Sequence, residues 1–263
     1  CKIADIVVVG GVRRSALISL SNVTDNRMSN AKNGNWYDTN GQRALANNSA
    51  VYSEKPDFDT YSGEMKRLYD SKSGERGIFS RIAAQKIAAR NERRDATFKF
   101  GTNPCSEIIL RPYQFCNLSE VIVRADDTEE TLKDKVKVAT ILGTLQSTMT
   151  DFRYLRNVWK KNTEEEALLG VSMTGIMDCK LTNGSTGTEK LGKLLETLKA
   201  VAVKTNKKWA ETLGVNQSVA ITCVKPSGTV SQLTDSASGI HPRFSDYYVR
   251  TVRADKKDPL ATA

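Results

Sequence analysis

The sequence has little that would bind a structural metal or build a disulfide scaffold. Its 263 residues include five cysteines and a single histidine, and no Cys-x-x-Cys pair occurs. Structural zinc sites take four Cys or His ligands, so we expect none. An odd number of scattered cysteines, with no recognisable secretory leader, predicts a chain kept in the reducing cytoplasm rather than a disulfide-bonded secreted protein.

Long apolar runs are also missing: no segment approaches the roughly 20 apolar residues of a membrane span. What is present is a basic chain with a formal net charge of +9. The basic residues are spread along the sequence without a helix-turn-helix, zinc-finger or RNP-like pattern. We therefore expect small phosphorylated ligands as partners, and neither nucleic acid nor membrane.

Apolar periodicity predicts strands that alternate with helices, with a polar, loop-like stretch over 22–48. The strands are expected over 12–20, around 98–123 and over 219–224. The helices are expected over 61–71, 78–90, 130–160 and 188–213, the last ending at Gly214. Thr163 and Glu166 have the spacing of a capping box for one more helix. Such alternation is typical of an α/β fold with much parallel sheet.

The most informative segment is 102–110, TNPCSEIIL, which is followed by Cys116. It places the amide of Asn103, the thiol of Cys105 and the carboxylate of Glu107 within five residues. An apolar segment disfavours the thiolate, and a neutral S–H donates a hydrogen atom better than it acts as a nucleophile. On a strand, residues i and i+2 share a face. The segment therefore predicts radical chemistry with all three side chains facing one ligand.

Five ordered motifs resemble those of ribonucleotide reductases. They are 103–108 (NPCSEI) with 115–118 (FCNL), 10–16 (GGVRRSA), 45–52 (LANNSAVY), 164–171 (EEEALLGV) and 225–231 (KPSGTVS). The set is most similar to the adenosylcobalamin-dependent, class II ribonucleoside-triphosphate reductases. The resemblance implies an α/β fold that is a portion of a ten-stranded α/β barrel with a central finger loop. Residues 1–263 would be a partial catalytic barrel domain, lacking the N- and C-terminal parts of the full enzyme.

The resemblance also implies catalytic roles. Cys105 would become a thiyl radical that takes the 3′ hydrogen of the ribose, Glu107 would act as general base on the 3′-OH, and Asn103 would hold the ribose hydroxyls. Cys116 would be one half of the reducing dithiol. The family's partner cysteine lies well upstream of 10–16, which Cys1 does not match, so no partner is assigned within this chain.

Ligand-binding roles follow in the same way. The substrate-phosphate loop would consist of Pro226, Ser227, Gly228, Thr229, Val230 and Ser231. Asn48 and Ser49 would line the substrate pocket. The loop between the specificity effector and the substrate would contain Gly11, Arg13, Arg14 and Ser15.

The implied cofactor is adenosylcobalamin without a protein ligand to cobalt, because the Asp-x-His-x-x-Gly pattern is absent around His241. The expected partners are a ribonucleoside triphosphate, a deoxynucleotide effector, a thioredoxin-like or small dithiol reductant, and the missing upstream half of the chain. The predicted activity is reduction to 2′-deoxyribonucleoside triphosphates. Two alternatives stay open: the large chain of a reductase whose radical comes from a metal-containing subunit, and a catalytically inactive nucleotide-binding fragment.

Overall fold

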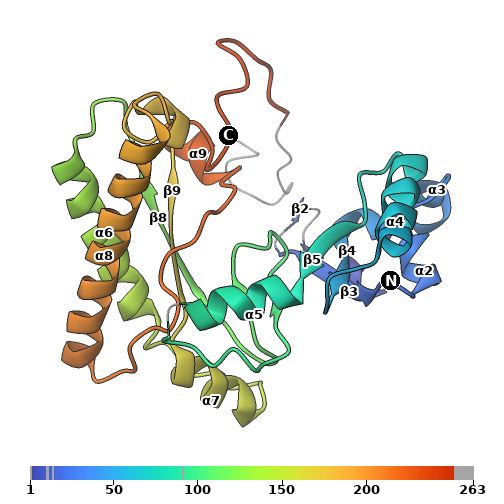
Figure 1. Ribbon diagram of the computed structural model, residues 1–263, viewed down its shortest axis with the longest axis horizontal. Helices are drawn as coiled ribbons and strands as arrows, with labels where there is room; N and C mark the ends of the chain where they lie inside the picture. The colour runs from blue at the N-terminus through green and yellow to red at the C-terminus, as the bar shows by residue number, and fades with distance from the viewer. Residues whose placement is uncertain (1, 10–11, 14, 91, 252–263) are drawn as a thin grey trace. The chain divides into compact units, whose positions relative to one another are not determined.

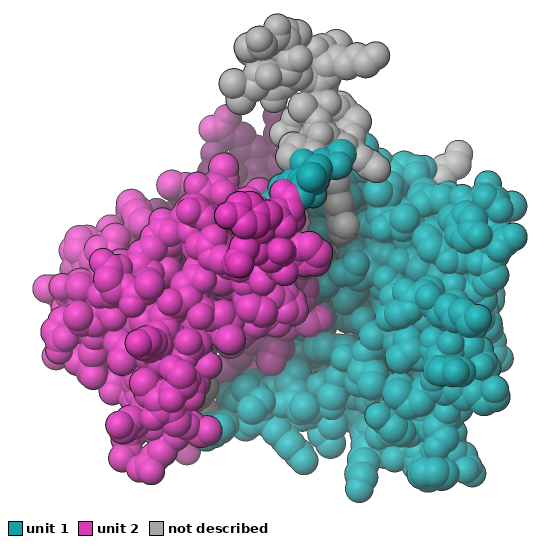
Figure 2. Space-filling model, turned by 90° about the horizontal axis from the view of Figure 1, so that it is seen from above, with its two compact units in different colours: residues 1–90, 96–104, 249–263 teal, residues 91–95, 105–248 magenta. Residues whose placement is uncertain are grey.

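The computed structural model describes residues 2–9, 12–13, 15–90 and 92–251 (Figure 1). The chain divides into two compact units, which Figure 2 shows in different colours. Unit 1 contains Cys1–Arg90, Ala96–Pro104 and Val249–Ala263, and unit 2 contains Asn91–Asp95 and Cys105–Tyr248. Among the described helices, none combines the length and the apolar character needed to cross a membrane.

Unit 1 is built around a small parallel sheet with β4 at its centre. Strand β4 pairs in parallel with β3 on one side and with β5 on the other. The elements of unit 1 are α1 (Lys2–Asp5), β1 (Val8–Val9), β2 (Val12–Arg13), β3 (Leu17–Asn22), α2 (Asn26–Ser29), α3 (Trp36–Asn40), the 3-10 turn η1 (Gly41–Leu45), β4 (Ala46–Tyr52), α4 (Phe58–Ser71), β5 (Gly77–Ser80), α5 (Arg81–Arg90) and β6 (Gly101–Thr102). Helix α4 connects β4 to β5 and is capped at its N-terminus by Asp57, whose side chain accepts a hydrogen bond from the backbone N–H of Thr60.

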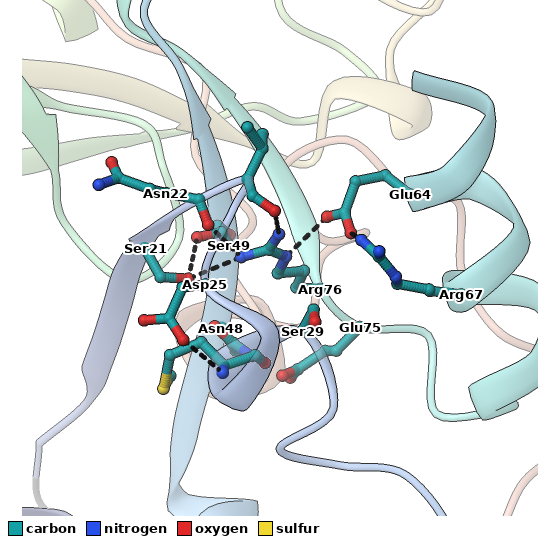
Figure 3. A network of polar contacts seen from close by, with 12 residues as sticks. Ser21, Asn22, Asp25, Ser29, Asn48, Ser49, Glu64, Arg67, Glu75 and Arg76 are labelled. Atoms are coloured by element: carbon teal, nitrogen blue, oxygen red, sulfur yellow. Dashed lines mark hydrogen bonds and ion pairs between the residues drawn. The ribbon is translucent and has the colours of Figure 1, made fainter. Parts of the chain in front are cut away.

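A buried arginine holds this sheet to α4 (Figure 3). The Nε of Arg76 lies 2.6 Å from Oε2 of Glu64 on α4. Its two terminal nitrogens donate to the hydroxyl of Ser21, to the carbonyl of Asn22 and to the carbonyl of Val23. Because all these groups are paired, the guanidinium can be buried without a large desolvation penalty.

Unit 2 contains a second parallel sheet, in which β8 pairs with β9 over six residues from Asn117↔Leu169 to Ile122↔Thr174. Its elements are β7 (Ile109–Leu110), β8 (Asn117–Ile122), α6 (Glu129–Gln146), α7 (Asn157–Glu166), β9 (Leu169–Thr174), the 3-10 turn η2 (Ile176–Asp178), α8 (Thr188–Leu213) and α9 (Val230–Leu233). On the other side of β9, residues 220–223 run parallel to it and are joined to it by backbone hydrogen bonds and the bridge Val171↔Thr222.

Helices α6 and α8 lie side by side and cover one face of the sheet of unit 2 (Figure 1). The core between them is a cluster of buried apolar side chains. Its members include Val121, Val123, Leu132, Val136, Leu169, Val171, Leu198, Ala202 and Ile221. Helix α6 begins with a capping box in which Thr128 and Thr131 exchange side-chain and backbone hydrogen bonds. The core and the caps together make this the region that anchors β8 and β9.

Several sequence expectations are confirmed and others are wrong. The α/β class is confirmed, and so is the helix over 188–213, which ends at Gly214 in a left-handed conformation. The single helix over 130–160 is wrong, because α6 stops at Gln146 and α7 begins at Asn157. The hydroxyls of Ser147 and Thr148 bind carbonyls of the preceding turn and so compete with helix continuation.

Three local assignments are also corrected. The proposed capping box of Thr163 and Glu166 lies in the last turn of α7 rather than at a helix start, and Glu166 is bonded to an arginine instead. The polar stretch 22–48 is not a simple loop, since it contains three short helices and the start of β4. The expected helix over 78–90 begins as β5 and becomes helical at Arg81.

Candidate functional site

The Cys105 segment is a turn rather than a strand. Ser106 has a φ of +63°, in the left-handed region, and the residues from 103 to 108 form no strand. The sequence argument that put Cys105 and Glu107 on one strand face is therefore wrong, because strand alternation does not apply through a left-handed residue. Cys105 is exposed in the structure, so the structure does not show the burial among apolar side chains that was expected for this thiol.

The boundary between the two units separates the predicted site residues into two groups. Unit 1 contains Asn48, Ser49 and Asn103. Unit 2 contains Cys105, Glu107, Cys116 and the loop 226–231. Within unit 2, the charges of Glu107 and Lys225 lie close enough to Cys116 and Cys223 to affect the pKa of both thiols.

Desolvation raises the pKa of both Cys116 and Cys223. Burial, with a smaller contribution from the Glu107 carboxylate, raises the pKa of Cys116 to about 11, against the opposing effect of Lys225. Burial and then Glu107 raise the pKa of Cys223 to about 12. Both groups are therefore neutral S–H groups at neutral pH, a form suited to hydrogen transfer and poor at nucleophilic attack.

The carboxylate of Glu107 has an unused hydrogen-bonding position. Its Oε2 is buried and has no hydrogen-bond partner among the described residues. A buried polar atom without a partner costs free energy unless water or a ligand satisfies it. An ionised carboxylate only accepts hydrogen bonds, so Glu107 is placed to accept one from a hydroxyl group of a ligand.

Gly170 allows three side chains to meet beside this cluster. A Cβ atom at this position would lie 2.5 Å from Cδ2 of Leu118, 2.7 Å from Cδ1 of Ile108 and 3.2 Å from Sγ of Cys223. Real Cβ contacts are not that short, so only glycine fits here without movement. The glycine of the 164–171 motif thus has a packing role close to Cys223.

Cys116 and Cys223 flank β9 on opposite sides. Cys116 directly precedes β8, whose first residue, Asn117, donates to the carbonyl of Leu168, while the N–H of Cys223 donates to the carbonyl of Val171. With β9 between them, their backbones are at least two strand spacings apart, about 9.6 Å, and the register also offsets them along β9. This exceeds the Cα separation of a disulfide, and we assign no partner to Cys116 within unit 2.

Residues 109–114, between Cys105 and Cys116, are held by a buried polar network that the sequence did not indicate. Arg94 donates to both oxygens of Glu166, with Nε–Oε1 at 3.1 Å and Nη2–Oε2 at 2.7 Å, and its Nη1 donates to the carbonyl of Ile109 at 2.9 Å. The amide nitrogen of Gln114 lies 2.5 Å from Oε2 of Glu166. The end of α7 is thereby joined to residues 109–114.

A second set of contacts reinforces the same connection. Arg111 donates to the side chain of Asn162 at 3.1 Å and to Oε2 of Glu165 at 2.6 Å. The backbone N–H of Phe115 donates to the hydroxyl of Thr163 at 3.2 Å. The only signal in the sequence was the run of three glutamates in 164–171, which pointed to a motif but not to these partners.

Two of the three hydroxyl groups of the 226–231 loop form hydrogen bonds within the protein. The buried Ser227 forms a short hydrogen bond with the hydroxyl of Thr174 at the end of β9, and the hydroxyl of Ser231 donates to the carbonyl of Gly228 at 3.2 Å. Gly228 and Thr229 are exposed. The part of the loop open to a ligand is therefore its tip.

In unit 1, Asn48 lines a cavity of about 400 Å³ beside β3, β4 and α2. Its Nδ2 donates to the carbonyl of Met28 at 2.8 Å, while its Oδ1 is buried and unpaired among the described residues. Ser49 follows it on β4, where its carbonyl accepts from Ser21 (Figure 3). Asn103 precedes the turn and its amide is near the Thr102 hydroxyl, at 3.5 Å. Of the two predicted pocket residues Asn48 and Ser49, Asn48 is therefore the one that borders this cavity.

The expected effector loop is only partly visible. Gly11 and Arg14 lie outside the described residues. The backbone of Arg13 belongs to β2 and is paired with Val8 of β1. Ser15 is exposed, and its N–H donates to the carbonyl of Val7 at 3.3 Å.

Comparison with known proteins gives consistent results. Adenosylcobalamin-dependent ribonucleoside-triphosphate reductases match 98% of this chain, at 29% identity in Lactobacillus acidophilus, 30% in Levilactobacillus brevis and 31% in Lactobacillus helveticus. The chain spans about 37% of the length of these relatives. No protein-family model matches it. The resemblance inferred from the motifs is therefore confirmed over nearly the whole chain.

Two solved structures share the fold. A B12-dependent, class II ribonucleotide reductase superposes with a TM-score of 0.67 at 23% identity, covering 91% of this chain and 35% of that protein. The alpha subunit of the Actinobacillus ureae class Id ribonucleotide reductase superposes with a TM-score of 0.62 at 14% identity, covering 88% and 50%. At these identities the superpositions establish the α/β fold of the chain and nothing finer.

Proposed function

We propose that the protein containing this segment reduces ribonucleoside triphosphates to 2′-deoxyribonucleoside triphosphates by a thiyl-radical mechanism that depends on adenosylcobalamin. The observation that carries the proposal is the Glu107 carboxylate of unit 2, which has one buried, unpaired oxygen among the described residues and helps to raise the pKa of the Cys116 thiol. The match of 98% of the chain to reductases of this kind supports the same reading.

The parallel sheets of the two units would be portions of one ten-stranded barrel, with residues 1–263 forming part of its catalytic domain. Two observations support this. Both β3–β4–β5 and β8–β9 are parallel, as in half-barrels built by helix crossovers. The superposition on a class II reductase covers 91% of this chain and only 35% of that enzyme.

Adenosylcobalamin, when bound, supplies the radical that oxidises Cys105. The Cys105 thiol fits such a cofactor, because it is exposed and therefore accessible to a radical that the cofactor generates. We assign no residue of the chain to hold the corrin ring. The thiyl radical then takes the 3′ hydrogen of the ribose, and Glu107 accepts the proton of the 3′-OH.

Reduction needs two further electrons, which two thiols supply. The balanced reaction converts one ribonucleotide and two thiols to one deoxyribonucleotide, one disulfide and water, and the 2′-hydroxyl leaves as that water. Cys116 would be one of the two thiols, and its partner would come from the remainder of the protein. A dithiol reductant would then restore the pair, and the tip of the 226–231 loop would hold the substrate phosphates.

The test is reduction of a radiolabelled ribonucleoside triphosphate by the full protein with adenosylcobalamin and dithiothreitol. Cys105→Ala is compared with Cys179→Ala, which alters a buried core cysteine of the same unit. We expect product from wild type and Cys179→Ala, none from Cys105→Ala, and none without the cofactor. Product formed without adenosylcobalamin, after addition of a metal-containing radical subunit, would instead support the subunit-dependent alternative.

A further inference from the structure

We propose that unit 2 carries an additional anion site, for a short polyphosphate chain, in a cavity between Arg93 and one face of α8. The cavity has a volume of about 410 Å³. None of its lining residues belongs to the 226–231 loop or to the Cys105 segment. The proposal therefore stands apart from the reductase activity proposed above.

The charge on the cavity wall is strongly unbalanced. Three lysines of α8 line it, Lys199, Lys204 and Lys207, together with Arg93 and a single carboxylate, Glu196. Their spacing of three to five residues puts the α8 members on one side of the helix. In the described parts of the chain none of the four cations forms an ion pair. Four cations and one carboxylate leave the wall of this concavity positively charged, so it attracts an anion.

Arg93 supplies the independent observation that points to a ligand. Its Nε is buried, and no hydrogen-bond acceptor among the described residues contacts it. Burial also lowers the pKa of the Arg93 guanidinium, although an arginine stays protonated at neutral pH. A buried N–H of a cation without a partner is costly, and an anionic oxygen in the cavity would satisfy it.

The spacing of the cations favours a chain of phosphates over a single small anion. Lys199 and Lys207 are eight residues apart, about 12 Å along the helix axis. Consecutive phosphates match this length better than one small anion does, because they can engage several cations in turn. The guanidinium of Arg93 pairs with phosphate oxygens through a planar fork, and the lysines act as point charges. Because the site is concave, it suits a short chain better than a duplex.

The experiment is isothermal titration calorimetry of the full 263-residue chain with inorganic tripolyphosphate. We expect one site whose Kd rises about tenfold or more in Arg93→Met and in Lys207→Met, the effect of losing a charge-assisted hydrogen bond. Lys208→Met is the matched control, because Lys208 is the exposed neighbour on α8 that does not line the cavity. It should leave Kd within about twofold. Arg93→Lys, which keeps the charge and loses the fork, should give an intermediate loss.

Further titrations distinguish the source of the phosphates. Adenosine triphosphate binding like tripolyphosphate, with adenosine not binding, would show that a nucleotide tail and a free chain are both accepted. Adenosine binding as well as the triphosphate would overturn the proposal. So would equal losses in Lys207→Met and Lys208→Met, or displacement of tripolyphosphate by a lower concentration of duplex DNA. Binding unaffected by the Arg93 and Lys207 substitutions would place the anion elsewhere, such as at the 226–231 loop, and would also overturn it. Circular dichroism checks that each variant is folded.

Discussion

Arg94 and Glu166 form a two-point ion pair although they are 72 residues apart in the sequence. Their side chains are only 5% and 4% exposed. The pair joins the end of α7 to residues 109–114, because Arg94 also binds the carbonyl of Ile109 and Gln114 binds Glu166. The limb that leads from Cys105 to Cys116 is therefore fixed by charge-assisted hydrogen bonds rather than by apolar packing alone.

Glu166→Gln should lower the free energy of unfolding by about 3 to 5 kcal/mol, since it leaves the buried charge of Arg94 without a counterion. Urea denaturation monitored by circular dichroism measures the change. The control is Glu189→Gln, which breaks an exposed pair with Lys193 on α8 and should change stability by about 0.5 kcal/mol or less. A loss below about 1 kcal/mol in Glu166→Gln would show that the pair contributes little.

Gly170→Ala tests the close packing beside Cys223. The added methyl group would overlap Leu118 and Ile108 at 2.5 and 2.7 Å, and we expect a loss of about 1 to 3 kcal/mol from overpacking. Thermal unfolding measures it. Gly192→Ala on α8 is the matched control, because nothing lies within 4 Å of its Cβ position. Alanine there should stabilise the helix by about 0.5 to 1 kcal/mol, and a loss in both variants would contradict the packing argument.

The regular helices could be predicted from the sequence, but the site geometry could not. The helix over 188–213 follows from local apolar spacing and from Gly214, which ends it. The turn at Cys105 depends on the left-handed backbone of Ser106, a conformation that serine adopts rarely and that no pattern announces. Arg94 and Glu166 meet only in the folded chain, and residues 72 positions apart give no local pattern that predicts their contact. Local sequence patterns therefore located the motif around Cys105 but did not predict the contacts that hold it in place.

The raised pKa values of the half-buried thiols Cys116 and Cys223 predict an unusual pH profile for alkylation. Iodoacetamide reacts with thiolates, so the rate follows the deprotonated fraction. The pKa of Cys116 is raised to about 11 and that of Cys223 to about 12, so their rates should still increase above pH 9, where an ordinary thiol levels off. Peptide mass spectrometry of partially modified protein reads each site separately.

The same reaction in urea provides the reference, because unfolding removes the burial that raises both pKa values. There the two cysteines should react at similar rates and level off near pH 9. In the folded chain the exposed Cys105 should be modified before either of them. Early modification of Cys223 at neutral pH would contradict the structure.

In the full protein, Glu107→Gln should lower kcat for the proposed ribonucleotide reduction by about 10² to 10⁴, the range for loss of a general base, with KM little changed. Glutamine keeps the shape of the side chain but does not accept the 3′-OH proton. Glu120→Gln is the matched control, since Glu120 also has a buried, unpaired carboxylate oxygen among the described residues but lies on β8, outside the NPCSEI motif. We expect it to retain activity within about tenfold. Equal losses in both variants would mean that the local field of the two carboxylates matters, and that Glu107 is not the base.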